Sequence, residues 1–133
     1  MVIDSSALLA ILLKEPERDA FAAAIGEAGV RLVSSVNALE AAIVILARKG
    51  EPGLREFDLL SHAAGLDIVS FSTDHLMLAR EGYQRFGKGR HTASLNFGDC
   101  CAYALSRHSG EPLLFKGDDF PQTDVESALP ATG

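Results

Sequence analysis

The sequence predicts an α/β fold with three layers, α/β/α, built on a mainly parallel sheet of four to five strands. Short apolar runs alternate with longer segments of helical periodicity along most of the 133 residues. Strands that alternate with helices are joined by right-handed crossovers, which give parallel strands covered by helices on both faces. In such sheets ligands bind beyond the carboxyl ends of the strands.

The beginning of the chain predicts two strands and two helices. The run M-V-I-D at residues 1–4 is apolar and too short for a helix, so it predicts a strand. The serines after it can cap a helix over residues 5–14. Pro16 interrupts this helix and stands at the front of another over residues 17–25, which glycines bring to an end. R-L-V-S-S at residues 31–35 predicts the second strand.

The middle of the chain predicts two further helices and a third strand. Residues 36–49 carry apolar side chains on nearly all sides and end at Gly50, so they predict a helix that is buried on more than one side. A more polar helix is expected over residues 53–64. D-I-V-S-F at residues 67–71 contains β-branched and aromatic residues and predicts a strand.

The last part of the chain predicts two helices, a fourth strand and a candidate fifth. A capped segment predicts a helix over residues 73–87, and an apolar segment predicts another over residues 99–108. P-L-L-F-K-G at residues 112–117 reads as a strand, and T-D-V at residues 123–125 is a candidate edge strand. Residues 126–133 are expected to form a frayed tail.

The composition excludes several classes of protein. The length, and an apolar fraction of 47% against 23% charged residues, predict a single folded domain over residues 1–133. No run approaches the ~20 apolar residues of a membrane span. Asp4 stands where a signal peptide would be positively charged, so we expect a cytoplasmic protein that does not bind membranes. The neighbours Cys100 and Cys101 predict buried thiols in a reducing compartment.

The net charge of −6 argues against a general basic surface for nucleic acid. A phosphate polymer would therefore require local positive charge or a metal. The densest positive segment contains Lys88, Arg90 and His91 in a glycine-rich loop. Such a loop can contact an RNA backbone, although a solvated loop that ends a helix favourably explains it equally well. Phe97 and Tyr103 adjoin helical apolar positions, so we expect both in the core rather than stacked on bases.

Acidic residues from four separate segments are expected at the carboxyl edge of the sheet. Asp4 ends the first strand, Glu40 lies one turn into the helix after the second, and Asp99 opens the helix before the last main strand. Asp118 and Asp119 follow that strand. The aspartates also have ordinary structural explanations, because Asp4 and Asp99 can cap helices and the other two lie in a turn.

Glu40 has neither explanation. Its neighbours at helical spacing include the apolar residues Val36, Ile43, Val44 and Ala47, and no Lys or Arg lies one turn away. A buried charge without a partner is costly, so a cation or a function is expected, with a chance partner or a water-filled pocket as the alternative. Carboxylates that share a pocket need a cation or raised pKa values. An all-oxygen set points to Mg2+ or Mn2+, which can activate water for attack on a phosphodiester, the chemistry of a nuclease.

These segments together resemble a known family over essentially the whole chain. V-I-D-S-S-A-L near the start, the lone Glu40, L-N-F-G-D-C-C-A-Y-A-L and P-L-L-F-K-G-D-D-F-P-Q-T-D-V are similar to the VapC-type toxins of bacterial toxin–antitoxin pairs, which have the PIN-domain fold. The resemblance implies a metal-dependent endoribonuclease that cleaves tRNA or rRNA. It also implies a homodimer and a VapB-type antitoxin that blocks the acidic pocket.

The resemblance also assigns residues to the pocket. Asp4, Glu40 and Asp99 match the acids that hold Mg2+ or Mn2+, and the fourth acid matches Asp119, with Asp118 as the other candidate. Two polar residues match positions that flank the first and third acids, Ser6 and Asn96.

Two other functions are compatible with an acidic pocket on a parallel sheet. A phosphoaspartyl receiver also clusters acids around Mg2+ and uses a strand-end lysine such as Lys116. However, the first strand ends in a single acid, and no phosphorylatable Asp directly follows the central strand over residues 67–71. A non-catalytic binding module could instead accept an arginine from a partner protein in the same pocket.

Overall fold

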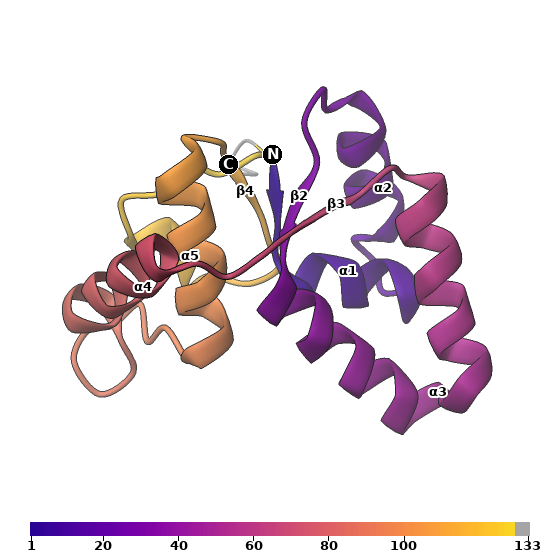
Figure 1. The fold of residues 1–133 in the computed structure, drawn as a ribbon, viewed down its shortest axis with the longest axis horizontal. Helices are drawn as coiled ribbons and strands as arrows, with labels where there is room; N and C mark the ends of the chain where they lie inside the picture. Colours follow the sequence, from indigo (N-terminus) through magenta and orange to yellow (C-terminus); the bar gives the residue numbers. More distant parts are fainter. Residues whose placement is uncertain (130–133) are drawn as a thin grey trace.

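The computed structural model describes residues 1–129 and contains a four-stranded sheet with five helices and a short 3-10 helix. Figure 1 shows the course of the chain. The elements are β1 (Val2–Ile3), α1 (Ser5–Leu12), α2 (Arg18–Glu27), β2 (Leu32–Ser34), α3 (Ser35–Ala63), β3 (Asp67–Val69), α4 (Thr73–Phe86), α5 (Phe97–Ser109), β4 (Leu113–Leu114) and η1 (Phe120–Gln122).

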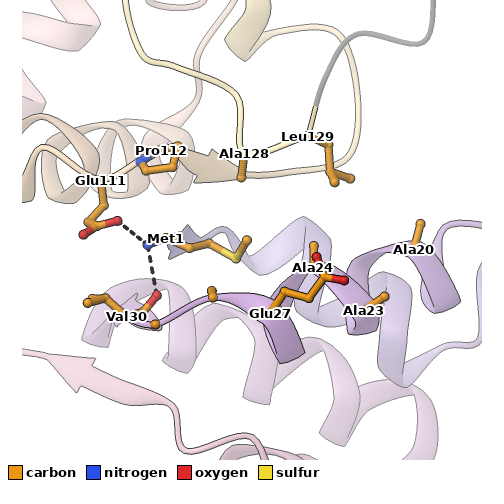
Figure 2. A pocket seen from close by; sticks show the side chains of 12 residues that line it. Met1, Ala20, Ala23, Ala24, Glu27, Val30, Glu111, Pro112, Ala128 and Leu129 are labelled. Carbon is orange, nitrogen blue, oxygen red and sulfur yellow. Dashed lines mark hydrogen bonds and ion pairs between the residues drawn. The ribbon is translucent and has the colours of Figure 1, made fainter.

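The strands are all parallel and lie in the order β3-β2-β1-β4. Val2 of the central strand β1 pairs with Leu32 on one side and Leu113 on the other. The amino end of β1 is fixed by the chain terminus, whose amine forms an ion pair with Glu111 at 2.6 Å and donates to the Val30 carbonyl at 3.0 Å (Figure 2). The predicted parallel sheet is confirmed, and its carboxyl edge is where a site is expected.

Helices cover both faces of the sheet, so the predicted three layers are confirmed (Figure 1). Successive residues of a strand point to opposite faces, and the two residues of β1 follow this rule. Ile3 packs into the core formed with α1, α2 and α3, whereas Val2 packs into the core formed with α4 and α5. Tyr103 lies fully buried in the second core, as predicted.

The two helices predicted over residues 36–49 and 53–64 form one element, α3, with a kink at Gly50. Gly50 has φ 66° and ψ −160°, a conformation that is costly for residues with a side chain. The first half contacts α1 through Glu40 and α5 through Asn37, so the predicted burial on more than one side is confirmed, but it does not extend around the whole helix. Leu39 and Ile43 are 61% and 59% exposed, which leaves one face of α3 open.

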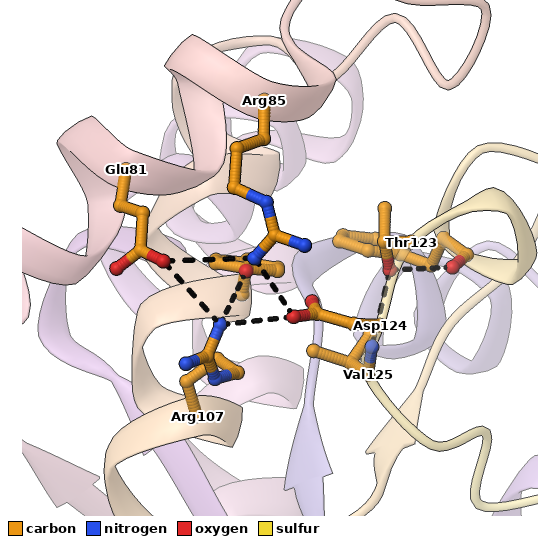
Figure 3. Close-up of polar contacts among 8 residues, drawn as sticks. Glu81, Arg85, Arg107, Thr123, Asp124 and Val125 are labelled. Atoms are coloured by element: carbon orange, nitrogen blue, oxygen red, sulfur yellow. Dashed lines mark hydrogen bonds and ion pairs between the residues drawn. The ribbon is translucent and has the colours of Figure 1, made fainter.

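Among residues 1–129, the fifth strand predicted over residues 123–125 does not form, and this segment bends instead. The Thr123 hydroxyl donates to the Phe120 carbonyl at 2.7 Å and accepts from the Val125 amide at 3.3 Å, which stabilises a turn over an extended strand. Asp124 is held by Arg85 of α4 and Arg107 of α5, each at 3.0 Å (Figure 3).

The tail expected to fray over residues 126–133 begins with an ordered segment. The Leu113 amide donates to the Glu126 carbonyl at 2.8 Å, and the Ala128 amide donates to the Leu113 carbonyl at 2.8 Å. Ser127 forms an isolated parallel bridge with Leu113. The edge of the sheet is therefore covered by residues 126–129, while residues 130–133 lie outside the described part of the chain. No helix in the described residues is long and apolar enough to cross a membrane.

Candidate active site

Asp4 lies at the carboxyl end of the central strand and caps α1. Its amide donates to the Leu114 carbonyl at 2.9 Å, and its Oδ2 accepts from the Ser6 amide at 3.0 Å. The predicted cap is therefore confirmed. The second oxygen, Oδ1, is buried without a hydrogen-bond partner among the residues that the structure describes. Capping thus uses only half of this carboxyl group.

The surroundings of Asp4 favour its protonated form. The residue is only 2% exposed, and this burial raises the pKa of its carboxyl from 3.8 to about 7, against the lowering effect of the Ser6 hydrogen bonds. The negative charges of Asp99 and Glu40 raise the pKa further. Three of the predicted acids are therefore close enough to repel one another.

Glu40 is half-buried on α3 and has neutral partners. The Ser5 hydroxyl donates to its Oε1 at 2.5 Å, and the Asn37 amide group approaches the same oxygen at 3.5 Å. No lysine or arginine in residues 1–129 forms an ion pair with it. Asn37 is fully buried and also donates to the Gly98 carbonyl at 3.0 Å, which connects α3 to the first turn of α5.

The sequence suggested that Asp99 caps α5, but another residue does so. The helix begins at Phe97, and Asn96 is its cap: the Asp99 amide donates to Asn96 Oδ1 at 2.9 Å, and the Asn96 amide donates to Asp99 Oδ2 at 3.0 Å. This reciprocal pair is a capping box, and it orients the Asp99 carboxylate. Burial raises the pKa of Asp99, and the charges of Asp119 and Glu40 raise it further.

The acids that follow β4 differ in their relation to this pocket. Asp118 and Asp119 are both exposed, in the turn before η1. The charge of Asp119 acts on the Asp99 carboxyl, whereas the Asp118 carbonyl accepts from the Gln122 side chain at 3.1 Å. The Ser6 hydroxyl accepts from the Lys116 amide at 3.0 Å, which fixes the start of this segment against α1.

The Lys116 ammonium group is engaged elsewhere. It forms ion pairs with Glu15 at 3.3 Å and Glu17 at 3.2 Å, both in the connection between α1 and α2. A phosphoaspartyl receiver would need this lysine beside the phosphorylated acid, so its placement opposes that alternative.

Sequence reasoning missed three residues that shape the pocket: Ser5, Asn37 and Gly98. A Cβ atom at Gly98 would lie 2.4 Å from Glu40 Oε2, so only glycine allows the carboxylate to approach the helix here. Asn37 precedes Glu40 by one helical turn, a spacing that could have identified it. Nothing in the sequence marks the contact of Gly98 with a helix some sixty residues earlier.

The donor chemistry of the pocket fits a hard divalent cation. Asp4, Glu40 and Asp99 each use one carboxylate oxygen in the hydrogen bonds above, and all the donors are oxygens, which Mg2+ and Mn2+ prefer. In residues 1–129, however, no three His, Cys, Asp or Glu side chains stand close enough together to hold a metal ion. A cation would have to draw the carboxylates nearer to one another.

The glycine-rich basic loop lies beyond α4. Lys88 and Arg90 are exposed, and the Arg90 guanidinium donates to the Gln84 carbonyl at 3.1 Å. His91 accepts from the Ala93 amide at 2.9 Å, and its ring packs edge-on against Phe86 at 5.2 Å between ring centroids. His91 therefore has a structural role in the loop, and RNA contact by the three residues stays a prediction.

Comparisons with known proteins agree with the resemblance. The family model for the PIN domain matches residues 1–126. The VapC ribonuclease Mb0640 of Mycobacterium bovis is 52% identical over 131 residues, which cover 98% of this chain and 100% of that protein. Ribonuclease VapC of Mycolicibacterium smegmatis is 52% identical over 125 residues, 94% of this chain and 97% of that protein.

A solved structure shows the same fold. The crystal structure of VapC20 from Mycobacterium tuberculosis, described as a toxin that cleaves the sarcin-ricin loop, superposes with a TM-score of 0.78. The match covers 97% of this chain and 98% of VapC20 at 15% sequence identity.

Proposed function

This chain belongs to the PIN-domain family and is a VapC-type ribonuclease toxin, and on that premise we propose that it hydrolyses RNA at the acidic pocket. Asp4, Glu40 and Asp99 form the centre of the proposed site, and Asp119 is its fourth acid. The observation that carries this assignment is the convergence of acids from three separate elements around Asp4, whose pKa is raised to about 7 by burial and, to a smaller extent, by the charges of Asp99 and Glu40.

The pocket requires positive charge before it can accept RNA. Ionised carboxylates repel a phosphodiester, so a cation must offset them. When bound there, Mg2+ or Mn2+ supplies charge to stabilise the phosphate oxygens and Lewis acidity to favour ionisation of water. Ser5, Ser6 and Asn96 hold the carboxylates in fixed orientations through hydrogen bonds, which limits their reorganisation when the substrate enters.

The partners follow from the family. As a ribonuclease toxin of the VapC type, the protein has RNA as its substrate and an antitoxin as its inhibitor. We propose a VapB-type antitoxin that places a segment at the acidic pocket, and we propose that the protein acts in the cytoplasm, where its RNA substrate is found.

The open face of α3 supports a homodimer. Leu39, Ile43 and Leu46 follow one another at helical spacing and are 61%, 59% and 43% exposed. A surface of this kind is typical of association between subunits. Light scattering should give the mass of a dimer for the wild type, and Ile43→Lys should shift it toward the 14.1 kDa monomer.

Cleavage of small structured RNAs by the purified protein tests the proposed site. Cleavage should require Mg2+ or Mn2+, stop on addition of chelator, and fall by at least about 100-fold in Asp99→Asn, more than loss of an outer-shell partner usually costs. Asp119→Asn should reduce it more than Asp118→Asn does. Asp58→Asn, which changes an exposed acid of α3, is the matched control. Cleavage that survives chelator or Asp99→Asn would refute the assignment.

A further inference from the structure

A second pocket lies beside the acidic site, between α4 and α5, with a volume of about 660 Å3. One wall comes from α4 and the loop after it, and the opposite wall comes from the first turns of α5. Cavities of ~300–1,000 Å3 are typical of sites for small organic groups. Its walls include Phe71, Arg80, Tyr83, Lys88, Asn96 and Phe97.

Phe97 is the most unusual residue of this pocket. The sequence predicted it in the core, but it is 76% exposed, the highest value among the large apolar residues that the structure describes. The reason is that α5 begins two residues earlier than expected, which makes Phe97 the first helical residue after the Asn96 cap. Exposed phenyl surface gains nothing from burial on folding, so folding does not explain why Phe97 stands there.

The charges around the pocket favour an anionic ligand. No acidic side chain lines it, although the chain as a whole carries a net charge of −6. Arg80 and Lys88 line it, and neither forms an ion pair with any residue in the described range. By contrast, Arg85, which lies on α4 as Arg80 does, forms an ion pair with Asp124 at 3.0 Å.

The start of α5 contributes residues both to the pocket and to the acidic site. Asn96 lines the pocket and also donates its amide to the Asp99 carboxylate at 3.0 Å. Phe97 is separated from Asp99 only by Gly98, which contacts Glu40. On the other wall, the Tyr83 hydroxyl donates to the Lys88 carbonyl at 3.0 Å and so fixes a second aromatic ring. A nucleotide in this pocket would directly adjoin the phosphate at the acidic site.

We propose that this pocket binds an unstacked base of the RNA next to the cleaved bond, with Phe97 as the stacking surface. Arg80 and Lys88 contact the flanking phosphates. The inference rests on the proposed ribonuclease function and adds to it a determinant of substrate choice. An aromatic face stacks on any base, while cations that form no ion pair in the described residues suit a phosphate backbone better than an uncharged apolar peptide.

The test compares RNA with and without bases. Fluorescence anisotropy with Mg2+ present, in an Asp99→Asn background that the proposed function expects not to cleave, gives the affinity for labelled hexanucleotides A6, C6, G6 and U6. A hexamer of abasic ribose phosphates keeps the charge and removes the stacking partner. Phe97→Ala should weaken binding of at least one base-bearing hexamer about 5- to 150-fold, the equivalent of ~1–3 kcal/mol for one stacked base, and leave the abasic affinity unchanged.

Three other variants sharpen the result. Phe97→Trp should restore base-dependent affinity, because it retains an aromatic face. Arg80→Gln should weaken base-bearing and abasic hexamers alike and reduce the salt dependence of binding. Leu59→Ala removes a side chain that is 69% exposed on α3, away from the pocket, and should change neither affinity.

Several outcomes would overturn the inference. Equal losses for base-bearing and abasic hexamers in Phe97→Ala would mean that Phe97 does not stack on a base, and so would the absence of any loss. A change only in subunit association or antitoxin binding would identify the pocket as a protein interface. The proposed function fails separately: absence of cleavage by the wild type with metal would refute it, even where Phe97→Ala shows a base-dependent loss of affinity.

Discussion

Replacement of Asp4 by Asn tests the electrostatics of the pocket through protein stability. The variant keeps nearly the same shape and a good helix cap, because Asn and Asp cap helices about equally well. It removes only the ability of residue 4 to ionise. A change in stability with pH that disappears in Asp4→Asn is therefore the effect of this one carboxyl group.

The direction of the effect follows from the raised pKa. The pKa is about 7 in the folded protein against 3.8 for the ordinary group, so the folded state binds the proton more tightly than the unfolded state. The protonated Asp4 carboxyl therefore contributes to the stability of the folded state. This contribution is fully present below about pH 4 and is lost as the pH rises through about 7. The full difference corresponds to about 4 kcal/mol, at ~1.4 kcal/mol for each tenfold change in affinity for the proton.

Urea unfolding between pH 5 and pH 8 measures this contribution. Asp4→Asn should be more stable than the wild type. The gap between the two free energies of unfolding should widen by about 2–3 kcal/mol from pH 5 to pH 8. Adding Mg2+ or Mn2+ at pH 8 should narrow the gap, because a cation stabilises the ionised carboxylate of the wild type. A gap that stays constant from pH 5 to pH 8 would show that Asp4 does not titrate there and would refute the reasoning. Asp58→Asn, at an exposed site, is the control.

Further substitutions test the packing around the site. Gly98→Ala should abolish RNA cleavage while leaving a folded protein, since the new Cβ would lie 2.4 Å from Glu40 Oε2 and displace that carboxylate; retained cleavage would contradict the close approach. Gly82→Ala places a Cβ 2.6 Å from the Tyr103 ring and should lower the free energy of unfolding by about 1–3 kcal/mol in urea titrations. Asp124→Asn weakens two arginine contacts that are largely exposed, so it should cost at most about 1 kcal/mol, less at high salt.

The sheet and most helices could be predicted because local patterns determine them. The apolar runs around Ile3 and Val33 are too short for helices, and each is followed by a capping residue, Asp4 or Ser34. Glu40 could be identified as unusual because helical spacing alone shows that it lacks a nearby cation. These inferences depend on residues less than two turns apart, the range over which sequence patterns are informative.

The predictions were wrong where the sequence allows two local conformations and contacts with distant residues determine which one forms. Asn96 and Asp99 are both good capping residues, and each accepts from the amide of the other, so the helix start could not be chosen from composition. Because the helix begins at Phe97 rather than at Asp99, Phe97 lies on the surface and not in the predicted core. The segment over residues 123–125 has the composition of a strand, but the bonds between Asp124 and two arginines on other helices hold it in a bend.

Several features that oppose folding lie close together around the carboxyl edge of the sheet. There the protein buries Asp4 with a raised pKa and an unpartnered oxygen, leaves Phe97 exposed, and leaves Arg80 without an ion pair in the described residues. Other parts of the fold follow ordinary rules: Tyr103 is buried, and Asp124 is bonded to two arginines. Folding alone would not select such a concentration of unfavourable features at one edge. A cation would relieve the acids, and RNA would cover the phenyl ring and the free cations, so one bound complex accounts for all of them.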